Sequence, residues 1–321
     1  MSKIFRPGYY KLFSCIAGEC EDSCCRSGWE IPLDDETFSF YKSCGAEDIE
    51  KNTVTGSDGG RIFKLSENGN CPYLDEKGLC RLYALTGGRL GEICSKYPRF
   101  TEEYDGFTEE GISISCPEAQ RLILSAEPVD YALDGELPDE ELLSFLHKAR
   151  KRAFEIVFAA DSPDEAAAKL LDFGDVLEEY LFDEYFDLPM EELYFEPSPL
   201  RECYLKGYSQ IAGLILDKTD ILYPEWRELM QTALNGDMKA QGLDDKTGKA
   251  YLYYLIFRYF LKGVNIESVG VICRFIAGAY ILTTRLPGEF LKNARLFAKE
   301  VEHDGDNLDA LLDAMIEIYF A

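Results

Sequence analysis

The sequence predicts a mainly α-helical protein, in which an irregular, cysteine-rich, metal-binding N-terminal module precedes an all-α helical C-terminal domain. Nine of the eleven cysteines lie before residue 126, in a segment that is also rich in glycine and turn-forming residues. Beyond that point apolar residues recur at helical spacing and cysteines become sparse. We therefore expect a cysteine-rich metal- or cluster-binding module over 1–125 and an α-helical domain over 126–321.

The N-terminal segment lacks long periodic stretches. Residues 55–60 and 67–70 are built almost entirely from glycine and small polar residues, which predicts loops. A segment of this composition folds around crosslinks or metal ions, because it cannot bury a large apolar core.

The C-terminal segment carries clear helix signals. Acidic residues follow Pro138, and Ser162 precedes Pro163 and two acids, which predicts a capped helix start at each place. Residues 251–260 are apolar or aromatic on nearly every face, which predicts a central core helix. Helices are expected over 200–217, 224–235, 245–262, 266–285, 287–301 and 306–319, and the third of these contains that core segment.

Composition and charge restrict the class of protein. At 321 residues and 46% hydrophobic residues, the chain is globular and long enough for one large or two modest cores. We expect that the first residues, with two basic side chains and a Pro-Gly pair, are not a secretory signal. The most apolar stretch, 266–286, is interrupted by Glu267, Arg274 and Arg285, which a membrane span would tolerate poorly. We therefore expect a cytoplasmic protein without membrane association.

The formal net charge of −26 argues against nucleic acid as a partner, since such a surface repels phosphate backbones. It would attract cationic groups, such as lysine side chains or a sulfonium. A simpler interpretation is that the charge serves solubility alone.

The cysteines themselves are the strongest functional signal. Disulfides would need an oxidising compartment, and buried structural thiols would scatter as Cys203 and Cys273 do. Bunching in turn-rich loops instead indicates metal ligation by converging thiolates. With Cys44 set apart, the candidate ligands are Cys15, Cys20, Cys24, Cys25, Cys71, Cys80, Cys94 and Cys116.

Ligand spacing favours a 4Fe–4S cluster over zinc, because the sequence has no C-x2-C knuckle. Neighbouring side chains in an extended segment point to opposite sides, so Cys24 and Cys25 can serve two centres unless the backbone kinks. Eight thiolates exceed the needs of one cluster, which leaves open a second metal, a spare thiol pair or an open cluster position. The segment Cys20-x3-Cys24 begins the radical S-adenosylmethionine triad, but Ser27 occupies its third position.

Two sequence blocks carry a family resemblance. The block from Pro7 to Trp29, with its four cysteines, resembles the start of the flagellin lysine-N-methylase family. The block from Cys71 to Arg99 is similar to the wider class of zinc- or iron-chelating CxxCxxCC proteins, and 116–119 completes the methylase pattern. The aromatic helix around 254–260 is similar to the C-terminal half of that family.

The resemblance implies transfer of a methyl group from S-adenosylmethionine to lysine ε-amines of a flagellin-like protein. It also implies a cysteine-held iron–sulfur centre, with the eight cysteines named above at the matching ligand positions. It leaves open which four hold the cluster.

The residues alone support methyl transfer only weakly, because no glycine-rich turn follows a buried strand to bind the methyl donor. The donor would then lie against the cysteine module. Trp29, Tyr83 and Tyr97 could bind a sulfonium or lysine through their rings, or shield the metal from water. Arg99 could bind a carboxylate or balance the charge of the thiolates. No catalytic residue is identified.

Two other functions compete with this one. The protein could be a non-catalytic metal-chelating or electron-transfer protein. It could also be a helical interaction protein with structural zinc. A visible spectrum of anaerobically purified protein distinguishes iron–sulfur clusters from zinc.

Overall fold

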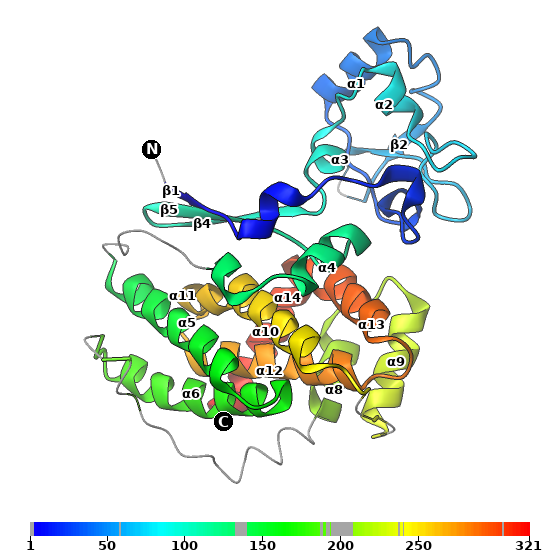
Figure 1. The fold of residues 1–321 in the computed structure, drawn as a ribbon. Coiled ribbons are helices and arrows are strands. Elements are labelled where there is room, and N and C mark those ends of the chain that lie inside the picture. The colour runs from blue at the N-terminus through cyan, green and yellow to red at the C-terminus, as the bar shows by residue number, and fades with distance from the viewer. Residues whose placement is uncertain are drawn as a thin grey trace. The chain divides into compact units, whose positions relative to one another are not determined.

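A computed structural model describes residues 3–57, 59–131, 140–186, 189–190, 193, 208–236, 238–239, 241–303 and 305–321 (Figure 1). The chain forms two compact units, which we name by their content. The helical unit comprises Met1–Leu12, Thr101–Ser115 and Gln120–Ala321, and the cysteine unit comprises Phe13–Phe100 and Cys116–Ala119. The two units are thus interleaved along the chain. The consecutive division into 1–125 and 126–321 stays a prediction.

The mainly α-helical class is confirmed over the described residues. In the helical unit, the helices are α5 (Glu141–Ala159), α6 (Pro163–Phe182), α8 (Tyr208–Lys218), α9 (Pro224–Leu234), α10 (Asp245–Tyr259), α11 (Gly263–Ile266), α12 (Val269–Arg285), α13 (Phe290–Phe297) and α14 (Gly305–Tyr319). None of the helices in the described part of the chain is long and apolar enough to span a membrane.

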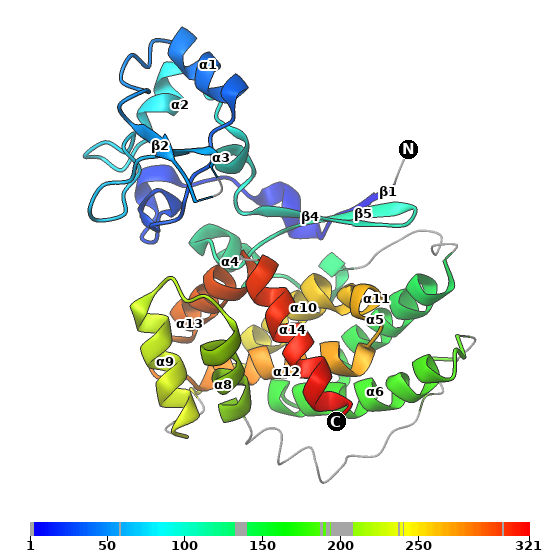
Figure 2. The same ribbon diagram turned by 180° about the vertical axis from the view of Figure 1, so that it is seen from behind.

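Helices α10 and α12 form the centre of the helical unit, with other helices around them in both views (Figures 1 and 2). Every residue of α10 from Ala250 to Tyr259 is buried, so the predicted core helix is confirmed. The predicted cap at Ser162 is also confirmed, since its hydroxyl accepts the Glu165 N–H at 3.1 Å and Pro163 opens α6.

Several predicted helix bounds need correction. The helix predicted over 266–285 begins at Val269, because Glu267 adopts a left-handed φ of 50° and Ser268 caps the new helix. The helix predicted over 287–301 leaves the α geometry after Phe297 and continues as a π-helix over Ala298–Glu302. The start predicted at Pro138 and residues 200–207 lie outside the described residues.

A three-stranded sheet has the order β1 (Lys3–Phe5), β5 (Phe107–Ile112) and β4 (Arg99–Tyr104). Strands β1 and β5 are parallel, with Lys3 opposite Phe107 and Phe5 opposite Glu109. This pairing explains why the first residues belong to the helical unit.

The cysteine unit consists of short elements and loops (Figure 2). Helices α1 (Asp35–Ser43), α2 (Arg81–Leu85) and α3 (Glu92–Lys96) accompany a hairpin of β2 (Thr53–Thr55) and β3 (Arg61–Phe63). Its core is small and comprises Leu33, Tyr41, Ala46, Ile49, Phe63, Cys71, Tyr73 and Leu82.

Candidate metal centre

The cysteine unit contains all nine N-terminal cysteines, and each described cysteine is a free thiol. Short elements position seven of the eight candidate ligands, and Cys71 lies in a loop. Cys15 and Cys20 bracket a 3-10 turn at Ala17–Glu19, and Cys24 and Cys25 lie in a second turn at Cys24–Arg26. Cys80 and Cys116 each precede the first residue of a helix, α2 and α4 (Pro117–Leu124), and Cys94 lies within α3.

Backbone amides point at three of these sulfurs from two residues further along the chain. The Ala17 N–H donates to Cys15 Sγ, with 3.4 Å between the nitrogen and the sulfur. Cys20 accepts the N–H of Asp22 in the same way, and Cys71 accepts that of Tyr73. A donor aimed at sulfur favours the thiolate over the thiol, which is the form that binds metals.

At the two cysteines that precede helices, the free N–H groups of the first helical turn donate to the sulfur and favour the thiolate. Cys80 accepts the N–H groups of Leu82 and Tyr83, and Cys116 accepts those of Glu118 and Ala119. Five of the eight candidate ligands therefore lie in turns that stabilise a negative charge on sulfur. Cys273, in contrast, is fully buried where α6 meets α12, and burial raises its pKa.

Burial and nearby positive charge shift the pKa values of these thiols in opposite directions. Burial raises the pKa of Cys71 to about 11 and also raises the pKa of Cys80, while the Arg81 guanidinium lowers both. At the doublet, a hydrogen bond from Cys24 lowers the pKa of Cys25 to about 7, and Ser23 and Arg26 add to this effect.

Arg26 and Arg81 belong to no recognised motif, although each directly follows a candidate ligand. Arg81 is held in place, since its guanidinium donates to the Pro72 carbonyl at 2.8 Å and lies 5.1 Å from the Tyr73 ring centre. A fixed cation beside several thiols offsets the charge that they would bring to a metal.

As the side chains stand, no three His, Cys, Asp or Glu residues of the described ranges are placed to hold a metal ion. The metal-binding character of the module therefore stays a prediction. The donor chemistry fits a thiolate-bound metal, because the described cysteines form no disulfide, lie in one compact unit and in five cases receive backbone donors.

The predicted ring and arginine residues occupy different surroundings. The rings of Trp29 and Tyr97 meet edge to face with centres 5.3 Å apart. The Arg99 guanidinium lies 5.0 Å from the centre of the Phe13 ring, and Tyr83 is 58% exposed. The structure thus joins Trp29 to Tyr97, and the roles of all four residues stay predictions.

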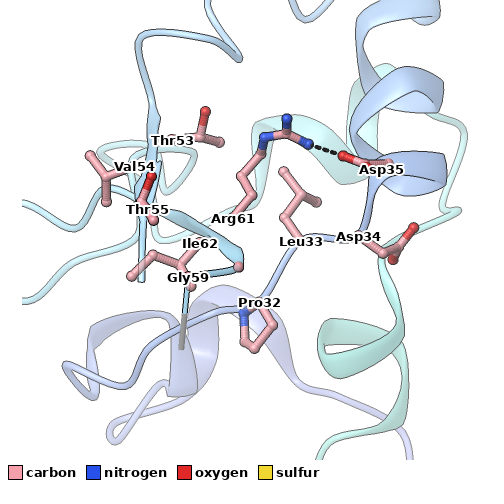
Figure 3. Close-up of a pocket in the computed structure, with 11 residues that line it drawn as sticks. Pro32, Leu33, Asp34, Asp35, Thr53, Val54, Thr55, Gly59, Arg61 and Ile62 are labelled. Carbon is pink, nitrogen blue, oxygen red and sulfur yellow. Dashed lines mark hydrogen bonds and ion pairs between the residues drawn. The ribbon is translucent and has the colours of Figure 1, made fainter. Parts of the chain in front are cut away.

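A cavity of about 740 Å³ opens in the cysteine unit between 32–35 and the β2–β3 hairpin (Figure 3). Its charged side chains already have partners. Figure 3 shows Arg61 reaching Asp35, with 2.6 Å between the paired atoms. Asp34 caps α1 by accepting the Thr37 N–H at 2.7 Å. We therefore place the candidate chemistry at the thiols and not in this cavity.

The helical unit contains a buried polar group that the sequence pattern does not mark. The Glu302 carboxylate accepts hydrogen bonds from Tyr254 at 2.5 Å and Ser113 at 2.8 Å, and its other oxygen is buried without a partner. Glu302 ends the π-helix, a distortion that is frequent at functional sites. No motif marks this group, because Ser113 and Glu302 are 189 residues apart.

The chain is similar in sequence to flagellar proteins and lysine-N-methylases of Salmonella. Lysine-N-methylases of Salmonella choleraesuis and Salmonella typhimurium are 34% identical to the chain over 131 and 133 residues. These matches cover 38% of this chain but only 32% of each relative. The flagellar biosynthetic protein FliU of Salmonella muenchen is 34% identical over 167 residues, which are 49% of this chain and 97% of that protein. The chain belongs to the flagellin lysine-N-methylase family.

Membership of the flagellin lysine-N-methylase family confirms the resemblance seen in the sequence blocks. No family model and no solved structure matches the chain. Since the chain spans about a third of the relatives named lysine-N-methylase, their activity and substrates are proposals for this protein.

Proposed function

We propose that this protein is a protein-lysine N-methyltransferase, with S-adenosylmethionine as methyl donor, flagellin-like proteins as substrates and an iron–sulfur centre held by cysteine thiolates. The observation that carries the proposal is the set of N–H···S turns at five cysteines of the family pattern. The names of the relatives support methyl transfer to lysine.

For methyl transfer the protein must accept a deprotonated lysine and must bring together two substrates that are both positively charged in solution. A C–S bond of the sulfonium breaks and a C–N bond forms, so the lysine ammonium must first lose a proton and S-adenosylhomocysteine is released. Both the donor and the lysine arrive as cations. The net charge of −26 favours their approach, most strongly at low ionic strength.

Different residues of the cysteine unit would hold the metal centre, offset its charge and bind the sulfonium. When bound, an iron–sulfur centre supplies an iron atom that can ligate the amino-acid end of the methyl donor. The thiolates hold that centre, while Arg26 and Arg81 offset their charge. The rings of Trp29 and Tyr97, inclined at 69° to each other, offer π-faces to a sulfonium, whose positive charge such faces attract.

The test uses anaerobically purified full-length protein, reconstituted with iron and sulfide, and a flagellin substrate with S-adenosylmethionine and a reductant. Intact-mass and peptide mass spectrometry should show a gain of one CH2 for each methyl on lysine. Cys71→Ser should abolish the gain, whereas Cys44→Ser, in the same unit but outside the ligand pattern, should retain it.

Two outcomes would favour the alternatives. A brown protein that leaves the flagellin mass unchanged under these conditions would support an electron-transfer or metal-chelating role. A colourless protein with stoichiometric zinc would support structural zinc in a helical interaction protein. Calorimetry without heat on adding S-adenosylmethionine to cluster-replete protein would count against methyl transfer.

A further inference from the structure

Strands β2 and β3 of the cysteine unit alternate between hydrogen-bonded and unbonded residue pairs, as antiparallel strands do. Gly56, just beyond β2, donates its N–H to the Gly60 carbonyl at 2.7 Å. Two positions back along the ladder, Val54 lies opposite Ile62, so this pair is again a hydrogen-bonded one. The backbone groups of Val54 are therefore used within the hairpin.

The backbone groups of Thr53 and Thr55 point the other way, to the outer edge of β2. The far side of β3 is occupied, because the Arg61 carbonyl accepts the Leu33 N–H at 2.8 Å. Within the described ranges, no residue hydrogen-bonds to the outward N–H and C=O groups of the two threonines. Strand β2 is thus a free edge, whose donors and acceptors repeat every second residue, about 6.8 Å apart.

The outer edge of β2 lacks the residues that usually prevent the addition of a strand. Natural edge strands carry charged side chains or proline, which keep a second chain from pairing. In the three-stranded sheet, edge strand β1 is followed by Arg6 and Pro7, and edge strand β4 begins with Arg99 directly after Pro98. Residues 52–57 contain neither charge nor proline, and all three residues of β2 are β-branched.

The free edge borders the cavity of about 740 Å³. Thr53, Val54 and Thr55 line the cavity from one side of Arg61, and 32–35 line it from the other (Figure 3). Val54, in the middle of the strand, is 41% exposed. A strand added to β2 would therefore have a hollow beside it for its side chains, which is how peptides that add to a sheet edge are recognised.

Charge indicates which kind of segment fits this edge. The cavity lining carries two carboxylates, Asp34 and Asp35, against the guanidinium of Arg61. Hydrogen bonds from the Thr37 side chain and backbone lower the pKa of Asp34, which keeps it ionised at neutral pH. The net charge of −26 opposes pairing with a second copy of the chain and favours a basic segment.

We propose that the outer edge of β2 is the docking site for an extended, lysine-bearing segment of the protein substrate, which adds to the hairpin as a further strand. The identity of that substrate rests on the proposed function. Main-chain hydrogen bonds to Thr53 and Thr55 provide affinity without fixing the sequence of the segment, whereas the acidic cavity favours basic side chains.

Amide hydrogen exchange at single-residue resolution tests the docking in the full-length protein, with monomeric flagellin as the probe. In the free protein the Thr53 and Thr55 amides should exchange fast and the Val54 amide slowly, because only Val54 donates to β3. Saturating flagellin should slow exchange at both threonines at least about fivefold, which corresponds to one net hydrogen bond. An unchanged pattern under saturation would overturn the proposal.

A proline at the edge tests the same bonds by affinity. Thr55→Pro removes one outward N–H, leaves the bonds of Val54 to β3 in place and follows an extended residue, which proline tolerates. It should weaken flagellin binding at least about fivefold, measured by calorimetry. Thr55→Val is the matched control, because it keeps the N–H and the β-branched shape. Slow exchange at Val54 shows that the hairpin is intact in each variant.

Equal flagellin affinity of Thr55→Pro and the unmodified protein would exclude the β2 edge as the docking site. A second copy of the chain is the other candidate occupant. Slow exchange at Thr53 and Thr55 that appears on raising the protein concentration without flagellin, together with a dimer mass in sedimentation, would assign the edge to self-association and overturn the proposal.

Docking and methyl transfer can fail separately. Protection of Thr53 and Thr55 by flagellin that gains no methyl group would sink the proposed function and keep the inference. Methylated flagellin that leaves both threonines unprotected would do the reverse.

Discussion

The Arg150 guanidinium donates two parallel hydrogen bonds, of 2.9 and 2.6 Å, to the Glu109 carboxylate, and neither side chain is more than 2% exposed. Arg150 belongs to α5 and Glu109 to β5, so the pair joins the sheet to the helices within the helical unit. A buried, two-pronged ion pair fixes orientation, because removal of either partner leaves an uncompensated charge.

Replacement of either partner should be strongly destabilising. Arg150→Met and Glu109→Gln are each expected to lower the free energy of unfolding by about 3–5 kcal/mol, measured by urea denaturation. The double variant Arg150→Met/Glu109→Leu should lose less than the worse single variant, because no buried charge remains. Lys246→Ala, which breaks the exposed Lys246–Glu127 pair, should cost below about 1 kcal/mol. Equal losses at both sites would contradict this account.

His147 should make the protein sensitive to acid. Burial, with rings of Phe5 and Phe107 centred 6.3 and 6.2 Å away, lowers the pKa of His147 to about 4, and the nearby charge of Arg150 adds to this. The unfolded chain has a histidine pKa of about 6.5, so below that pH it binds a proton that the folded protein does not. The stability contribution is complete above about pH 6.5 and falls as the pH drops toward 4.

Urea midpoints at about pH 7.5 and about pH 5 test this effect. The midpoint should fall further for the unmodified protein than for His147→Phe, which keeps an aromatic ring but cannot bind a proton. Identical pH dependence in the two proteins would exclude His147 as the cause.

Gly174 should not tolerate a side chain. It lies in α6, where an added Cβ would come within 2.5 Å of the Cys273 Cβ in α12. Gly174→Ala should therefore cost about 1–3 kcal/mol of unfolding free energy through overpacking. Gly213, in α8, offers a matched control, since its added Cβ would make an ordinary 3.5 Å contact with Leu234. Gly213→Ala should gain up to about 1 kcal/mol. A gain at both positions would show that α6 and α12 can move apart.

Metal removal should unfold the cysteine unit selectively. Its core cluster holds only eight buried residues, whereas α10 and α12 anchor an extensive apolar core in the helical unit. Because the proposed metal centre would supply much of the folding energy of the smaller unit, chelation should abolish hydrogen-exchange protection over 13–100 and preserve it in α10 and α12. Uniform loss of protection across both units would contradict this prediction.

Local features of the chain were predictable because they depend on residues within one turn of each other. The cap at Ser162, the proline after it and the apolar run of 251–260 carry their structural meaning in the adjacent sequence. The π-helix that ends at Glu302 could not be predicted, since a helical sequence pattern does not distinguish α from π geometry.

The sequence by itself determined the mainly helical class, the eight clustered candidate thiols and the family to which the chain belongs. Tertiary structure decided that β1 returns to pair with β5 and that Arg150 neutralises Glu109. Helix periodicity and capping are short-range properties, whereas strand pairing, buried ion pairs and metal ligands join residues that are distant along the chain. Their partners are therefore chosen by how the chain folds back on itself.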